Sequence, residues 1–179
     1  MSPREEVTRE RLLKLLEELG RKFRHPARLY LSGGEGLVWR GLRGTTRDVD
    51  VHYEVSPDHH GDFVSVLREL KEKLSISIEE AYPGDFVPLP PGSERRCTFI
   101  ERFGQIDVFL FDPYAVALSK LERGHARDRE DVKALLAKRV IEPAELRRLF
   151  EAILPAYEAQ GVKSDPARFR KAIEAALAP

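Results

Sequence analysis

The stretch LYLSGGEGLVWRGLRGTTRDVDVHYE, residues 29–54, decides the fold that the sequence predicts. Its apolar opening predicts a short strand over 27–32, and the glycine pair that follows predicts a turn into a short helix. The run 46–55 alternates polar and apolar residues, which predicts a second strand with Asp48 and Asp50 on one face and valines on the other. The stretch therefore encodes a strand, a glycine turn, a helix and a second strand.

The flanking segments extend this unit into a small sheet with helices. Apolar residues at three- and four-residue steps predict a helix over 3–22 and another from Pro57. Further strands are predicted over 75–82, 95–103 and 105–111, the last two as a hairpin that turns near Gly104. The segment 83–94 contains four prolines and is predicted to be a surface loop. The remaining helices are predicted over 113–123, 126–138, 143–158 and 166–177.

This element order predicts an α+β fold in two parts. Residues 1–112 form a small mixed-sheet core with helices packed on it, beginning with an N-terminal helix. Residues 113–179 form a C-terminal helical region. Because composition does not shift at the boundary, we expect this region to pack on the core.

Composition narrows the functional classes. The formal net charge is zero, so there is no global basic signal for nucleic acid. The opening residues lack the apolar segment of a signal peptide, and no stretch is apolar for the length of a membrane span. The single cysteine, Cys97, excludes an internal disulfide and favours a reducing cytoplasm. The absence of asparagine and the abundance of charged residues favour a thermophile.

Asp48 and Asp50 form the first candidate site. Residues two apart on a strand project from the same face, so the carboxylates repel each other unless a cation binds them. Mg²⁺ is commonly held by one or two carboxylates together with substrate phosphates. Gly33 and Gly34 precede a helix start, where backbone N–H groups bind anions. Together these features predict a triphosphate and metal site. The alternative is an ordinary turn followed by a solvated strand face.

A third acidic residue, Asp107, interrupts the apolar strand 105–111 on the face that carries Phe109 and Phe111. A charge among aromatic side chains costs free energy unless something binds it. If this strand lies beside 48–53, three carboxylates converge and support two-metal phosphoryl transfer. The alternatives are an ion pair with an arginine or an exposed strand end.

The combination LSGG, TTRDVDV and QIDVFLF resembles the signature of the DNA polymerase β-like nucleotidyltransferase superfamily, with a spacer of thirteen residues between Gly34 and Asp48. More narrowly, RGLRGTTRDVDV resembles small prokaryotic nucleotidyltransferase-like proteins, among them abortive-infection-type toxins. The run DPYAVALSKLERGHARDREDVKALL resembles their second part, in which a lysine and aspartates help to form the nucleotide site. The matching residues are Lys120, Asp128 and Asp131.

The resemblance implies a Mg²⁺-dependent transfer of a nucleoside monophosphate from an NTP to a hydroxyl acceptor. The acceptor would be an RNA end, a protein or a small molecule, and a toxin would have a cognate antitoxin as partner. Phosphate contacts are implied for Ser32, Gly33, Gly34, Arg47 and Lys120. Metal ligation is implied for Asp48, Asp50 and Asp107. The third acid also helps to deprotonate the acceptor, and Asp128 orients the lysine or touches the nucleotide.

Departures from the family pattern keep a second hypothesis open. Glu35 follows the glycines, where a carboxylate is unfavourable beside a phosphate unless it points away or binds metal. His52 stands where an apolar residue is usual. These residues favour the alternative of a catalytically silent module that binds a nucleotide or a partner protein. His59 and His60, beside two aspartates, lie at a helix start and point in different directions. We interpret them as helix residues rather than a metal site.

Overall fold

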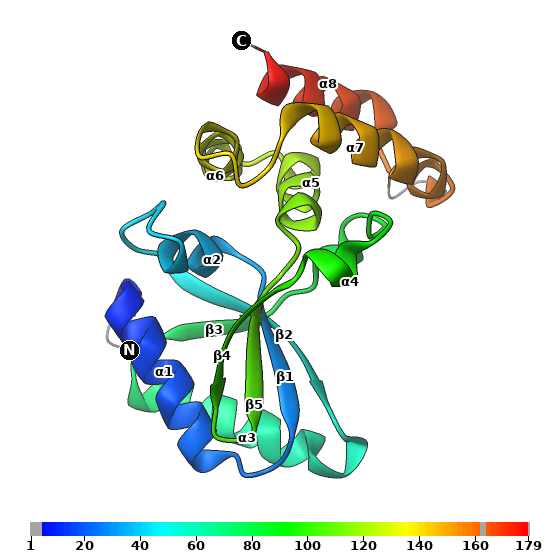
Figure 1. Cartoon of the computed structure of the whole chain (residues 1–179). Coiled ribbons are helices and arrows are strands. Elements are labelled where there is room, and N and C mark those ends of the chain that lie inside the picture. The colour runs from blue at the N-terminus through cyan, green and yellow to red at the C-terminus, as the bar shows by residue number, and fades with distance from the viewer. Residues whose placement is uncertain (1–4, 162–163, 179) are drawn as a thin grey trace. The chain divides into compact units, whose positions relative to one another are not determined.

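Five strands form one mixed sheet within residues 5–161 and 164–178, the part of the chain that this computed structural model describes (Figure 1). The strands are β1 (Ala27–Leu31), β2 (Asp48–Val55), β3 (Ser77–Glu80), β4 (Thr98–Phe103) and β5 (Ile106–Leu110). Their order across the sheet is β3-β2-β1-β5-β4. β1 pairs antiparallel with β2 and parallel with β5, and β4 and β5 form the expected hairpin. The predicted α+β class is confirmed.

Three helices complete the first unit, which comprises residues up to Ala81 together with Thr98–Phe111. They are α1 (Arg9–Lys22), α2 (Gly34–Trp39) and α3 (Pro57–Lys73). The core contains Leu12 and Leu16 of α1, Phe63 of α3, and Val49 and Val51 of β2. The valine face of β2 is therefore the buried face of the sheet, as the alternation of the sequence predicts.

The first helix begins at Arg9 rather than at residue 3. Val7 instead pairs with Thr46 through two backbone hydrogen bonds, in which Val7 N donates at 2.7 Å and Thr46 N at 3.0 Å. Thr8 then caps the helix by accepting a hydrogen bond from the N–H of Arg11. The prediction of a helix over 5–8 was wrong because Val7 takes a distant backbone partner, and residues 1–4 lie outside the described range.

The second unit contains residues 82–97 and the chain from Asp112 onward. It comprises η1 (Pro83–Asp85), α4 (Ser93–Arg96), α5 (Pro113–Arg123), α6 (Ala126–Ala137), α7 (Pro143–Glu158) and α8 (Pro166–Leu177). The proline-rich segment 83–94 is irregular outside η1 and the start of α4, as predicted, but it does not lie wholly at the surface, since Val87 is fully buried. Arg96, predicted to lie in the strand over 95–103, instead ends α4 and forms an ion pair with Asp112 at 2.7 Å. Residues 82–97 thus belong to the second unit, whereas the sequence analysis assigned them to the core of residues 1–112. No described helix is long and apolar enough to cross a membrane.

Two glycines allow α1 to lie against the β4–β5 hairpin. Gly104 takes a left-handed backbone with φ of 61° at the turn. A Cβ added at Gly104 would lie 2.3 Å from the carbonyl oxygen of Gly20, and one added at Gly20 would lie 2.5 Å from the backbone of Phe103. The helix and the turn are therefore in backbone contact, which no larger residue permits.

Replacing Gly104 by alanine should destabilise the first unit by more than about 1 kcal/mol, because the substitution combines a left-handed backbone with a backbone clash. Gly61→Ala is the matched control, since Gly61 lies within α3 and an added Cβ would meet nothing within 4 Å. That change should be neutral or stabilise the fold by up to about 1 kcal/mol. Urea denaturation measures both, and equal midpoints for the two variants would contradict the proposed contact.

Candidate functional site

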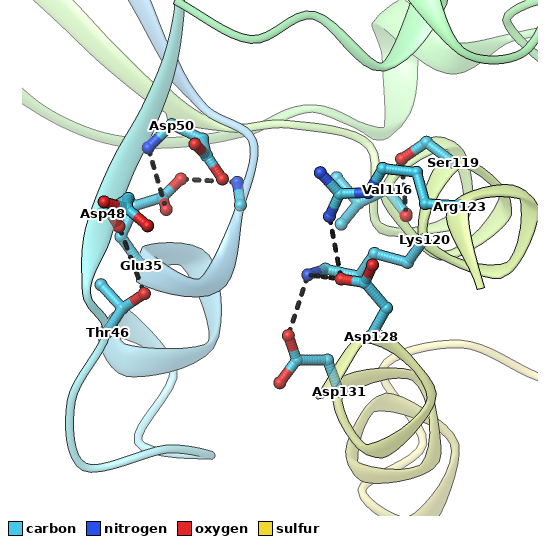
Figure 2. A network of polar contacts seen from close by, with 11 residues as sticks. Glu35, Thr46, Asp48, Asp50, Val116, Ser119, Lys120, Arg123, Asp128 and Asp131 are labelled. Carbon is cyan, nitrogen blue, oxygen red and sulfur yellow. Dashed lines mark hydrogen bonds and ion pairs between the residues drawn. The ribbon is translucent and has the colours of Figure 1, made fainter. Parts of the chain in front are cut away.

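The acidic pair lies at the start of β2. Asp48 and Asp50 are partly exposed, whereas Val49 and Val51 are buried, at 0% and 2% exposure. The pair thus projects from the face opposite the core, as predicted. Thr46, just before the strand, donates its hydroxyl hydrogen to the carbonyl oxygen of Asp48 at 3.2 Å. Figure 2 shows both carboxylates on the strand beside α2.

Gly33 makes room for the carboxylate of Asp50. A Cβ at Gly33 would lie 2.1 Å from Oδ2 of Asp50, closer than any side chain allows. The backbone turn therefore packs directly on the second aspartate. The close approach that glycine permits is used in this structure by a side chain of the protein itself.

Glu35 connects this turn to β2. Its side chain is fully buried, and its Oε1 accepts the N–H of Gly33 at 2.6 Å while Oε2 accepts the N–H of Asp50 at 3.3 Å (Figure 2). Burial, and next the negative charge of Asp50, raise the pKa of Glu35 to about 8. The carboxylate that looked unfavourable beside a phosphate thus points into the protein, where it fixes the glycine turn to the strand.

The polar donors of the turn are already bonded to protein oxygens. Ser32 donates its hydroxyl to the carbonyl oxygen of Ala81 at 2.8 Å and lies 3.1 Å from that of Asp50, and the N–H of Gly33 goes to Glu35. A Cβ at Gly34 would lie 2.7 Å from Oγ1 of Thr46. Contact of a triphosphate with Ser32, Gly33 and Gly34 stays a prediction, and it requires Ser32 and Gly33 to exchange their present partners. Arg47 is exposed immediately before β2.

The structure places Asp107 away from the acidic pair, so the predicted convergence of three carboxylates is wrong. β1 lies between β2 and β5, with Asp107 opposite Arg28, while Asp50 bonds to Ser32. Arg28 and Ser32, the residue that follows β1, are four residues apart, or roughly 13 Å along the strand at about 3.3 Å per residue, and β2 and β5 are two strands apart besides. Arg102 binds Asp107 at 2.6 and 3.0 Å, which lowers the pKa of that carboxyl. Asp107 thus takes the arginine ion pair that was the alternative.

A row of rings separates the two acidic positions on the same sheet face. His52, Tyr30 and Phe109 are cross-strand neighbours on β2, β1 and β5. The ring centroids of Tyr30 and Phe109 are 5.2 Å apart, and those of Tyr30 and His52 are 5.8 Å apart. His52, which departs from the family pattern, is therefore part of an aromatic row across the sheet.

In the second unit, Lys120 of α5 meets two aspartates of α6. Its ammonium lies 3.1 Å from Oδ1 of Asp128 and 2.8 Å from Oδ2 of Asp131, and all three side chains are buried (Figure 2). Residues three apart on a helix share a face, so the Asp-x-x-Asp spacing presents both carboxylates to the lysine. Of the two roles implied for Asp128, contact with the lysine is present in this structure.

Arg123 also belongs to this network, although the sequence analysis did not predict it as a site residue. Its Nη2 lies 2.8 Å from Oδ1 of Asp128. Among the described residues, Nε of Arg123 and Oδ2 of Asp128 are buried without a hydrogen-bond partner. Its place three residues after Lys120 on α5 could have indicated this role, because residues three apart share a helix face. The cluster balances two cations against two carboxylates and retains unused bonding capacity.

The Glu35 bonds predict a pH effect on stability. Because the pKa of about 8 lies above the ordinary 4.5, the contribution of Glu35 is full below pH 4.5 and is lost as pH rises toward 8. The loss proceeds at up to about 1.4 kcal/mol per pH unit. Glu35→Gln removes this titration and leaves one N–H unsatisfied, costing about 1–3 kcal/mol at low pH. The stability gap between wild type and variant should narrow by pH 8 in urea titrations, whereas parallel profiles would exclude the effect.

The Lys120 network predicts a large cost for losing its cation. Lys120→Met leaves Asp131 buried without this partner and should destabilise the chain by about 3–5 kcal/mol. Lys133→Met is the control, because Lys133 is exposed on the same helix as Asp131 and should change stability by less than about 0.5 kcal/mol. Denaturant midpoints measure both changes. Similar small effects would mean that the buried pairs contribute little.

Comparison of the sequence with known families identifies the family of this chain. The family model described as nucleotidyltransferase of unknown function (DUF6036) matches residues 10–174. Comparisons with curated proteins and with solved structures gave no match. The match spans the acidic pair, the glycine turn and the buried lysine network, so it covers both units. The chain therefore belongs to the family of nucleotidyltransferases of unknown function designated DUF6036.

Proposed function

We propose that the protein transfers a nucleoside monophosphate from an NTP to a hydroxyl acceptor and releases pyrophosphate. The acceptor oxygen forms a bond to the α-phosphorus and gives up its proton to solvent, as the bond to the pyrophosphate oxygen breaks. The observation that carries the proposal is that Asp48 and Asp50 project from the same face of β2. The chain also belongs to a nucleotidyltransferase family. Family membership supports an NTP as the donor.

The donor atoms at the acidic pair suit Mg²⁺. The pair supplies carboxylate oxygens at partly exposed positions, which is the ligand type and access that Mg²⁺ requires. Bound there, Mg²⁺ would neutralise charge on the triphosphate and on the departing pyrophosphate. Glu35 would act as a positioning residue, since its bonds fix the backbone of Asp50 and Gly33. Arg47 would attract the phosphates by its exposed charge.

The cations of the Lys120 network are candidate phosphate ligands in this proposal. A phosphate oxygen would compete with Asp128 and Asp131 for the ammonium, since all three are anionic oxygen acceptors. The unsatisfied Nε of Arg123 offers a further donor. We therefore propose that Lys120 and Arg123 exchange part of their bonding to carboxylates for bonding to phosphate when nucleotide binds.

A second candidate is a catalytically silent module that binds a nucleotide or a partner protein. Two observations favour it. The N–H of Gly33 is donated to Glu35, and Asp107 is bound by Arg102 far from the acidic pair. A binding module needs no metal at Asp48 and Asp50, so its cellular effect would survive loss of both carboxylates.

Asp48→Asn combined with Asp50→Asn should separate the two candidates. If the pair holds the metal, transfer from radiolabelled NTP with Mg²⁺ into total RNA or protein should fall at least about 100-fold, the equivalent of losing several kcal/mol of charge stabilisation. Folding should be unaffected or improved, because the variant removes repulsion between carboxylates. Calorimetry of NTP binding with and without Mg²⁺ provides the second readout.

Asp107→Asn is the matched control for this experiment. Because Asp107 pairs with Arg102 at the other end of the sheet face, its loss should change transfer by less than about twofold. Transfer by the double variant equal to wild type would overturn the catalytic proposal in favour of the silent module. If the acceptor belongs to the host cell, induced expression should arrest growth in wild type and not in the double variant. That outcome would support a toxin with a cognate antitoxin.

A further inference from the structure

Three potential metal ligands gather at the end of the sheet away from the acidic pair. His25 lies just before β1, and His59 and Asp62 lie near the start of α3. One ligand atom of each residue lies within 4.8 Å of the other two. The sequence predicts His59 and the aspartates beside it to be helix residues, because adjacent histidines at a helix start point in different directions. His25, which completes the cluster, is distant from them along the chain.

The fold itself creates this cluster. β1 and β2 run antiparallel with Ala27 opposite Val55, so the chain entering β1 meets the chain leaving β2 and starting α3. His59 and Asp62 are three residues apart on the helix and therefore share a face. The imidazoles of His25 and His59 stack, with ring centroids 3.5 Å apart and 10° between the planes.

Neighbouring aromatic rings hold the side chain of His25 in place, while the cluster remains accessible to solvent. The ring of His25 packs edge-on against Phe23 at 5.5 Å, and Phe23 packs against the buried Phe63 at 4.9 Å. His25 and His59 are partly buried, whereas Asp62 is exposed. An ion could therefore enter from the solvent side and retain water in its remaining positions.

The ligand set selects a class of metal. Neutral imidazole nitrogens suit Zn²⁺, Ni²⁺ and related divalent ions, whereas Mg²⁺ prefers oxygen ligands in octahedral geometry. Two histidines and one carboxylate form a common set of three protein ligands for such ions. We propose that His25, His59 and Asp62 bind one divalent transition-metal ion, at a site separate from the acidic pair that we assign to Mg²⁺.

Binding would change the stacked pair in a measurable way. The lone pairs of two parallel imidazoles do not converge on one point, so the ring planes must open beyond 10° to share an ion. The ion would then tie the segment before β1 to the first turns of α3. Because it binds the folded chain, it should raise the melting temperature as its concentration exceeds the dissociation constant.

Zn²⁺ added to the metal-free full-length chain tests the proposal. Calorimetry should show one ion per chain, histidine NMR signals of His25 and His59 should shift, and the melting temperature should rise. His59→Ala and Asp62→Asn should each weaken binding by more than about tenfold, since even loss of an indirect partner of a metal costs that much. Asp62→Asn, an exposed and nearly isosteric change, should keep the melting temperature of the metal-free chain.

The neighbouring histidine provides the matched control. His60 lies beside His59 in sequence but packs against Tyr53, with ring centroids 5.8 Å apart, so His60→Ala should bind Zn²⁺ as wild type does. The Asp48→Asn and Asp50→Asn variant should also bind Zn²⁺ normally, which separates this site from the proposed catalytic one. Unchanged Zn²⁺ binding in Asp62→Asn, or equal loss in His60→Ala, would overturn the proposed ligand set. Absence of binding by wild type would leave His25 and His59 as a stacking pair only.

Discussion

The two hydrogen bonds of Glu35 hold together the parts on which the candidate site depends. One carboxylate accepts the N–H of Gly33 on the turn and the N–H of Asp50 on β2, two groups that are seventeen positions apart in sequence. Because the side chain is fully buried beside the charge of Asp50, this bridge carries an electrostatic cost that its two bonds offset in part. The position of the second aspartate is thus set through its backbone, and the residue stays partly exposed.

The register of the sheet decides which charges act together. The face away from the core carries successive rows: Asp50 and Ser32, then His52, Tyr30 and Phe109, then Glu54, Arg28 and Asp107. An aromatic row therefore isolates an acidic pair from an ion-paired aspartate on one surface. The two acidic positions are offset by roughly 13 Å along the strands and by about 10 Å across them, or roughly 16 Å in all. Charges at that separation interact weakly through solvent, because the Debye length at physiological ionic strength is about 8 Å. Asp107 therefore pairs with Arg102 and lies apart from Asp50.

Local signals explain why much of the fold was predictable. Proline in the first turn marks the starts of α5, α7 and α8, and Gly124 in a left-handed conformation ends α5, so the boundaries of these helices follow from near neighbours. The predicted N-terminal boundary failed because Val7 pairs with Thr46, far along the chain. The predicted start of a strand at residue 95 was wrong for a similar reason, since Arg96 ends α4 and pairs with Asp112, sixteen residues along the chain.

The sequence by itself determined the strand alternation that exposes Asp48 and Asp50. It also determined the helical spacing that puts Asp128 and Asp131 on the same face of α6. Both follow from the fixed periodicities of strand and helix, which act over a few residues. Only the tertiary structure decided the partners of Glu35, the separation of Asp107 from the pair, and the meeting of His25 with His59. These depend on strand order and register, which join segments distant in sequence through backbone bonds that no local pattern specifies.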